Sequence, residues 1–185
     1  MADQNKSIPG PQTVARLARV HFLYIVAFAV SIMVFHAGNL VTPEVILQRW
    51  MAVAGMLVVT TMVWWLGRSG STSTYVAKLL VYALVVMDIA LATFLVYNER
   101  GMAGLGVALF AVPVVVSATL ASRTALFATA TLAATAYGIT CIKYFVDFFN
   151  EGYKLQLYAT IGFYGAMFFV LAGVLSIVLA VNRKK

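Results

Sequence analysis

Charged side chains are scarce in this sequence. Only 10% of its 185 residues are Asp, Glu, Lys or Arg, whereas 63% are hydrophobic. A soluble globular domain is closer to one quarter charged and one half apolar. The composition therefore excludes an ordinary water-soluble protein, and the modest length indicates one compact domain whose solvent is lipid.

The sequence has a single cysteine and no cluster of metal-ligating residues. Cys141 is the only cysteine, which excludes an intrachain disulfide. The two histidines, His21 and His36, lie too far apart on one apolar run to share a metal ion. The sequence contains neither a phosphate-binding loop nor a nucleophile beside a base. It therefore predicts no metal and no other cofactor, and no catalytic motif can be assigned within the chain.

Six long apolar runs make up most of the chain. They span about residues 20–41, 45–66, 75–97, 102–121, 124–146 and 155–181. A transmembrane helix needs roughly 20 apolar residues to cross about 30 Å of hydrocarbon, and backbone cannot lie unpaired in lipid. We therefore expect an all-α, polytopic membrane protein. Its six transmembrane helices should lie in residues 17–185, after a disordered polar tail in residues 1–16.

The basic residues predict the orientation of these helices. If the N-terminus is cytoplasmic, nine of the 13 Lys and Arg residues lie on the cytoplasmic side and four on the outer side. Because basic loops favour the cytoplasm, we expect both termini to be cytoplasmic, in a multi-pass protein of the inner (plasma) membrane. The net charge of +7 comes from basic residues in the short segments between the apolar runs, where membrane topology accounts for them better than nucleic-acid binding does. The expected partner is therefore the lipid bilayer, not nucleic acid.

Two charged residues near the predicted outer end of the fifth helix have opposite signs. Lys143 and Asp147 are four residues apart. Side chains with this spacing are neighbours on the surface of a helix. We therefore expect these two side chains to pair.

One carboxylate, Asp88, lies inside the third apolar run, in the segment "VVMDIALATF". It is about ten residues from either end of the run, so it should lie near the middle of the membrane, where Asp costs roughly 2.5–3.5 kcal/mol. No basic residue is expected at this depth, which favours a neutral, protonated carboxyl group. Two interpretations stay open: a hydrogen bond to another helix, or a site for a ligand, a proton or a signal.

The fourth run carries a second interruption, Pro113, in "FAVPVVVSA". Proline has no amide hydrogen, so the carbonyl of Leu109 loses its helical donor. Asp88 and Pro113 have similar predicted depths on adjacent helices, and a protonated Asp88 could donate to this carbonyl. An ordinary proline kink satisfied by its neighbours is the alternative. Thr93 and Ser117 are further candidate partners.

Part of the sequence resembles a known family. The segment "MDIALATFLVYNERGMAGLGVALFAVPVVVSATLASRTALFATATLAATAYGI" is similar to helices three to five of the six-helix N-terminal membrane modules of bacterial sensor histidine kinases, of the type IV pilus and redox-responsive types. Such modules have an Asp, a small polar residue and a Tyr in the third helix, then a glycine-containing hairpin, a Pro and a basic residue. The matching positions here are Asp88, Thr93, Tyr97, Gly101, Gly104, Pro113 and Arg123.

The resemblance implies a sensory input domain of a two-component system. Such a domain passes a membrane or lipophilic-ligand signal through its sixth helix, and its expected partners are a second copy or a cytoplasmic signalling domain. The candidate sensing residues are Asp88, Thr93, Tyr97, Pro113 and Ser117. Histidine kinase activity of a longer parent protein stays open. The outer hairpin, "NERGMAGLG", lacks the Asn-Pro-Phe element that redox-responsive kinases link with quinone, which argues against quinone sensing.

Two other classes of function stay open. A small transporter or channel subunit could use Asp88 as a proton or cation site, although such sites usually gather several polar groups on broken helices. A structural membrane protein could assemble through its fifth and sixth helices, because small residues let helix backbones approach closely. The small residues of the sixth helix include Gly162, Gly165, Ala166 and Gly173.

Overall fold

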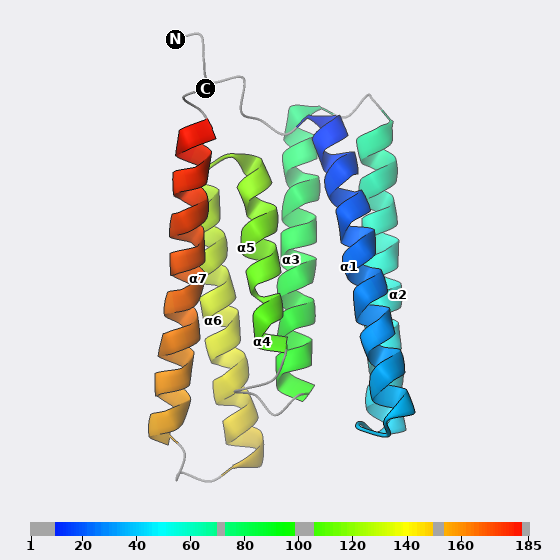
Figure 1. Cartoon of the computed structure of the whole chain (residues 1–185), viewed down its shortest axis with the longest axis vertical. Helices are drawn as coiled ribbons and strands as arrows, with labels where there is room; N and C mark the ends of the chain where they lie inside the picture. Colours follow the sequence, from blue (N-terminus) through cyan, green and yellow to red (C-terminus); the bar gives the residue numbers. More distant parts are fainter. Residues whose placement is uncertain (1–9, 70–72, 99–105, 150–153, 183–185) are drawn as a thin grey trace. The chain divides into compact units, whose positions relative to one another are not determined.

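The described part of the protein is almost entirely helical (Figure 1). A computed structural model describes residues 10–69, 73–98, 106–149 and 154–182. The helices are α1 (Pro11–Ala37), α2 (Pro43–Arg68), α3 (Thr74–Asn98), α4 (Gly106–Leu109), α5 (Ala111–Ser117), the 3-10 helix η2 (Ala118–Leu120), α6 (Arg123–Phe148) and α7 (Lys154–Asn182). Five of them, α1, α2, α3, α6 and α7, are long and apolar enough to cross a membrane, and Gly106–Leu120 forms a shorter apolar segment. The predicted all-α membrane fold is confirmed, whereas the side on which the termini lie stays a prediction.

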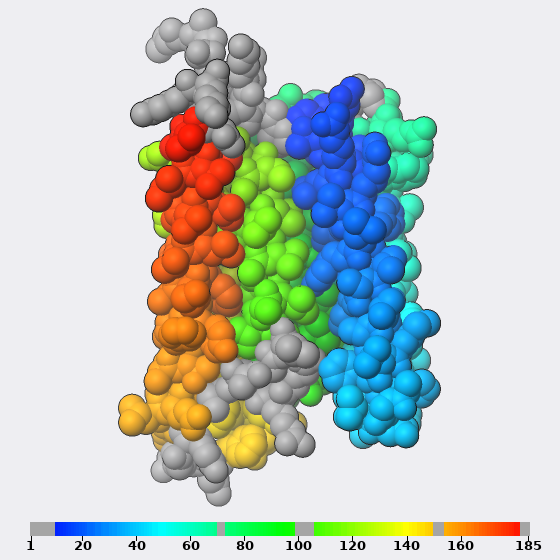
Figure 2. Space-filling model, viewed as in Figure 1, coloured from blue at the N-terminus to red at the C-terminus, as the bar shows by residue number. Residues whose placement is uncertain are grey.

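The chain divides into two compact units, and the boundary falls within α3 after Ala83. One unit lies within residues 8–83 and the other mainly within residues 84–185. Both have long rows of exposed apolar side chains. Those on α1 include Val20, Leu23 and Val30, and those on α7 include Phe163, Val170 and Ile177. Figure 2 shows α1 and α7 lying along the surface of their units. Such faces suit contact with lipid tails.

In the first unit, α1 and α2 form a closely packed helical hairpin. Each helix begins with a proline at its first position, where the missing amide hydrogen costs nothing. The start of α1 lies against the end of α2 at Gly67. A methyl group on Gly67 would lie 3.0 Å from the backbone nitrogen of Ala15 and 3.3 Å from the carbonyl oxygen of Pro11. The hairpin therefore depends on the absence of a side chain at this position.

The position of α1 corrects one predicted boundary. The polar tail was expected to extend through residue 16, but α1 already begins at Pro11. The physical reason is packing, because Val14 and Ala15 are buried and Val14 lies against Gly67. A helical turn with polar residues on one side only can still bury its other side. The rest of the predicted tail, residues 1–9, lies outside the described residues.

In the second unit, α6 and α7 pack side by side, and α5 contacts both. Gly138 of α6 lies close to Ile161 of α7, and Gly165 lies close to Ala134. Small residues of the fifth and sixth apolar runs therefore lie against the neighbouring helix within the chain itself. A dimer through these helices stays a prediction.

The described part of the fourth apolar run, residues 106–120, is broken into shorter helices. Between α4 and α5 the regular helix is interrupted at Phe110, whose amide donates to the carbonyl of Val107 at 3.2 Å. The break directly follows Leu109, the residue whose carbonyl would pair with an amide at Pro113 in a regular helix. The segment ends in a 3-10 turn and at Ala121, whose φ of 50° is left-handed. The described residues of this segment, 106–120, cover about 22 Å of helix.

Candidate functional site

Asp88 lies on the buried face of α3. Its side chain is 0% exposed, about ten residues before the helix ends at Asn98. The residues one and two turns away on the same face are also buried and apolar: Leu84, Leu91, Ala92 and Leu95. A carboxyl group in this setting requires a hydrogen-bonding partner or a neutral state, because isolated buried charge is costly. Asp88 is thus an intramembrane ionisable group that faces protein.

The other two candidates on α3 point elsewhere. Thr93 is five residues after Asp88, a rotation of about 140°, and Tyr97 is nine residues after it, a rotation of about 180°. Tyr97 is also about 14 Å further along the helix axis. Both side chains are half-buried. The structure therefore does not bring Tyr97 together with Asp88 in one cluster.

Pro113 and Ser117 lie one turn apart on α5, and both are buried. The hydroxyl of Ser117 donates to the carbonyl of Val114 at 2.8 Å. This bond uses the serine proton within its own helix. The face of α5 that carries Pro113 and Ser117 therefore offers carbonyl and hydroxyl oxygens as acceptors. A protonated carboxyl group is the kind of donor that would match them.

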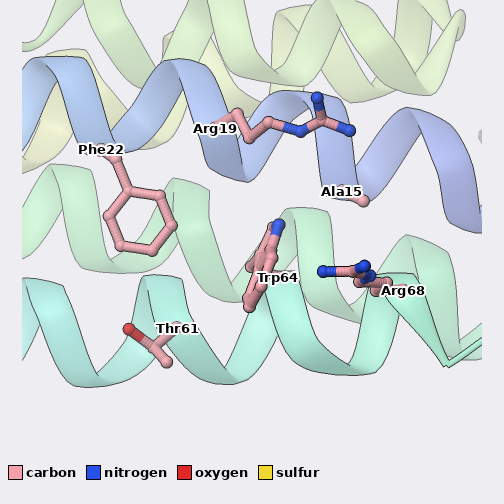
Figure 3. Close-up of a pocket in the computed structure, with 6 residues that line it drawn as sticks. All are labelled: Ala15, Arg19, Phe22, Thr61, Trp64 and Arg68. Carbon is pink, nitrogen blue, oxygen red and sulfur yellow. The ribbon is translucent and has the colours of Figure 1, made fainter.

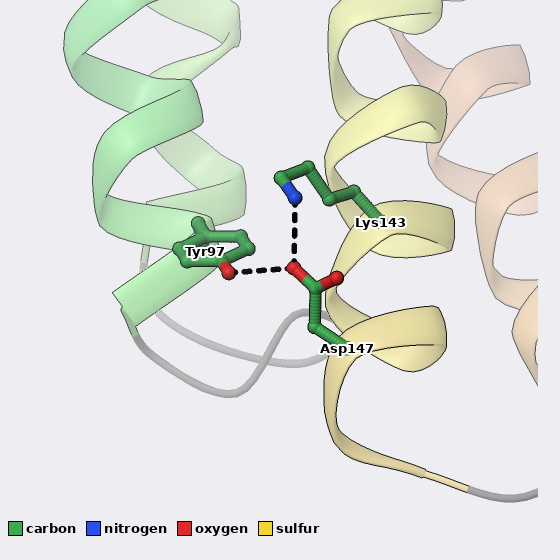
Figure 4. Close-up of polar contacts among 3 residues, drawn as sticks. All are labelled: Tyr97, Lys143 and Asp147. Carbon is green, nitrogen blue, oxygen red and sulfur yellow. Dashed lines mark hydrogen bonds and ion pairs between the residues drawn. The ribbon is translucent and has the colours of Figure 1, made fainter.

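Tyr97 belongs to a different polar cluster, at the far end of α3 (Figure 4). Its hydroxyl donates to Oδ2 of Asp147 on α6 at 2.8 Å, and Nζ of Lys143 lies 2.9 Å from the same oxygen. The predicted pairing of Lys143 with Asp147 is confirmed. The tyrosine was not foreseen as its third member, because no local spacing connects residues 97 and 147. Its position at the end of an apolar run was the only signal.

Aromatic rings surround this polar cluster. The ring of Tyr97 lies 5.9 Å from that of Tyr144 and 6.3 Å from that of Phe148, and the last two rings are 4.9 Å apart. Lys143 Nζ lies 5.8 Å from the centre of the Tyr97 ring. Aromatic residues and snorkelling lysines are typical of the boundary between hydrocarbon and water. The cluster therefore marks one membrane boundary of α3 and α6.

The first unit contains buried polar residues that sequence reasoning missed. Arg49 of α2 is 2% exposed, and its guanidinium lies 5.0 Å from the centre of the Phe35 ring. His21 of α1 is 3% exposed, and its Nδ1 lies 3.2 Å from Oγ1 of Thr60. The count of basic residues had assigned Arg49 to the outer side of the membrane. The two polar residues Gln48 and Arg49, inside an apolar run, were the signal for it.

No three His, Cys, Asp or Glu side chains gather as a metal site would require, within the ranges that the structure describes.

Comparison with protein families identifies the family of the chain. The profile of the PilS-like transmembrane domain matches residues 1–184. The chain belongs to the PilS-like transmembrane domain family. No curated protein and no solved structure matches it. The match extends the resemblance noted for helices three to five over nearly the whole chain.

Membership in the PilS-like family determines the general kind of protein. This is a multi-pass membrane domain, and its family points to the membrane sensory domains of histidine kinases. The broken segment α4–η2 lies in the fourth apolar run. The buried Asp88 lies in the third. These two elements carry all five candidate sensing residues.

Proposed function

We propose that this chain is the sensory input domain of a two-component histidine kinase, located in the inner membrane with both termini in the cytoplasm. It responds to a membrane state or a lipophilic ligand and passes the response through α7 to a cytoplasmic output. The observation that carries this proposal is Asp88, a completely buried carboxyl group in a spanning helix of a PilS-like domain. Intramembrane ionisable groups of this kind commonly mark functional sites.

The sensing site in this proposal centres on Asp88 and includes Pro113 and Ser117 of α5, whereas Thr93 and Tyr97 lie on other faces of α3 and have no direct part in it. In one state, a neutral Asp88 donates to an acceptor on the α4–α5 segment, where Pro113 offers no amide hydrogen to the Leu109 carbonyl. In the other state, a stimulus removes this bond. Because signalling requires two states with different stabilities, a change at Asp88 shifts the balance between them.

A chain of aromatic contacts supports a route from this segment to α7. Phe110, at the break between α4 and α5, lies 5.9 Å from Phe168 of α7 and 5.8 Å from Tyr137 of α6, between ring centres. All three side chains are buried. A rearrangement at the break therefore has a packed path to the output helix. α7 has 29 residues, about 43 Å, and so extends beyond a hydrocarbon core of about 30 Å.

The test uses a fusion of this domain to the catalytic core of a histidine kinase. Its autophosphorylation is measured in lipid nanodiscs that differ in acyl-chain length, at several pH values. Asp88→Asn keeps the size of the side chain but cannot ionise. We expect it to change basal output severalfold and to remove the response to these conditions. Glu44→Gln, the same chemical change at an exposed residue of α2, is the control and should respond as the parent does. Unchanged output of Asp88→Asn in every condition would contradict the proposal.

Transport is the competing function for the same residue. A proton or cation pathway through Asp88 predicts pH-dependent flux in proteoliposomes that Asp88→Asn abolishes. The sensory proposal predicts no flux above that of empty liposomes. A measured flux that depends on Asp88 would replace sensing by transport.

A further inference from the structure

A groove between α1 and α2 lies apart from the candidate sensing residues. It has a volume of about 610 Å³ and is lined by Ala15, Arg19 and Phe22 of α1 and by Thr61, Trp64 and Arg68 of α2. Figure 3 shows the guanidinium groups of Arg19 and Arg68 on the same side of the Trp64 indole, with Phe22 on the other side. The groove is thus cationic at one end and apolar at the other.

The cationic end has almost no opposite charge in its unit. Residues 8–83 contain five basic residues and a single carboxylate, Glu44. Glu44 is in the first turn of α2, whereas Arg68 is in its last turn, which places them about 36 Å apart along the helix. Both arginines of the groove are exposed. Two guanidinium groups that share a groove without a carboxylate favour binding of an external anion.

The side chains of the groove suit a phosphate group in particular. A guanidinium group donates two parallel hydrogen bonds to a phosphate, which makes Arg the preferred residue for this group. The guanidinium of Arg68 lies 5.4 Å from the centre of the Trp64 ring. This contact holds the arginine head beside the groove and limits the conformational freedom lost on binding.

The apolar end indicates where the phosphate comes from. The groove lies between the ends of two spanning helices, a level at which Trp and Arg typically meet lipid headgroups. The two aromatic side chains of the groove, Phe22 and Trp64, are half-buried. A soluble anion would contact only the arginines, whereas a lipid would also cover this apolar surface.

We propose that this groove binds the phosphate headgroup of an anionic membrane lipid. Arg19 and Arg68 pair with the phosphate, and Phe22 and Trp64 contact the glycerol and the first methylenes of an acyl chain. Basic pockets between transmembrane helices are known to bind anionic lipid headgroups. The binding is independent of the proposed sensory function, since its measurement requires no kinase output.

The test measures lipid binding by the purified full chain. Phosphatidylglycerol and phosphatidylcholine are added to delipidated protein in detergent, and the bound lipid is counted by native mass spectrometry. Two basic contacts near a membrane surface correspond to about a thirtyfold preference for the anionic lipid. We expect Arg19→Gln/Arg68→Gln to lose this preference. Arg19→Lys/Arg68→Lys, which keeps the charge but not the paired hydrogen bonds, should retain only part of it.

The matched control is Arg16→Gln/Arg123→Gln, which removes the same charge from two exposed positions outside the groove. It should bind phosphatidylglycerol as the parent chain does. An equal loss in both double variants would show a general charge effect and overturn the proposal. Inorganic phosphate at millimolar concentration should not displace the lipid. Complete displacement by phosphate would assign the groove to a soluble anion and would equally overturn the lipid assignment.

Discussion

Tyr97 of α3 and Asp147 of α6 are joined by a hydrogen bond of 2.8 Å across 50 residues of sequence. Lys143 binds the same carboxylate oxygen from one helical turn away. A tyrosine donor and a lysine cation thus converge on one acceptor at the end of two spanning helices. This cluster connects the ends of α3 and α6.

The first prediction concerns the Tyr97–Asp147 hydrogen bond. Tyr97→Phe removes the donor and keeps the ring, so we expect a lower Tm in detergent. Asp147→Asn should lower Tm further, because it also removes the ion pair with Lys143. In a double-mutant cycle the two changes should be less than additive. The control is Tyr82→Phe, the same change at an exposed position of α3, which should leave Tm nearly unchanged. Strictly additive effects of Tyr97→Phe and Asp147→Asn would disprove the coupling between these two residues.

The second prediction concerns Gly67. Gly67→Ala places a methyl group 3.0 Å from backbone of α1, and such overpacking costs roughly 1–3 kcal/mol. We expect a clear fall in the free energy of unfolding measured in mixed micelles. Gly55→Ala is the matched control on the same helix, since no atom lies within 4 Å of the added methyl group. Helix propensity should make this control neutral or stabilising by up to about 1 kcal/mol. Equal effects at the two positions would exclude the close contact.

The third prediction concerns the break in the fourth apolar segment. Pro113→Ala restores an amide hydrogen that can pair with the carbonyl of Leu109. We expect slower hydrogen exchange of the amides of residues 110–114, because α4 and α5 can then join into one regular helix. Pro43→Ala at the first position of α2 should leave exchange there nearly unchanged, since that amide has no helical partner. Unchanged exchange around residue 113 would place the cause of the break elsewhere.

The sequence predicted some local relationships well and distant ones poorly. The pairing of Lys143 with Asp147 followed from helical spacing. The fourth run was expected to form one helix with a proline in it, so the break at Phe110 was not predicted. The third partner, Tyr97, and the buried pair of His21 with Thr60 depend on how separate helices meet. The start of α1 was placed too late, because polar composition gives no information about burial against Gly67.

The sequence by itself determined that the chain lies in a membrane, that its segments are helices, and which family it resembles. Lipid offers the backbone no hydrogen-bonding partners, so six long apolar runs had few alternatives. Only the tertiary structure decided which faces of these helices are buried. Nine residues separate Asp88 from Tyr97, which turns their side chains to opposite sides of α3. Packing then buries the first, whereas the second reaches Asp147 at the membrane boundary. Apolar runs exposed to lipid carry little amphipathic pattern, so the sequence could not reveal this difference.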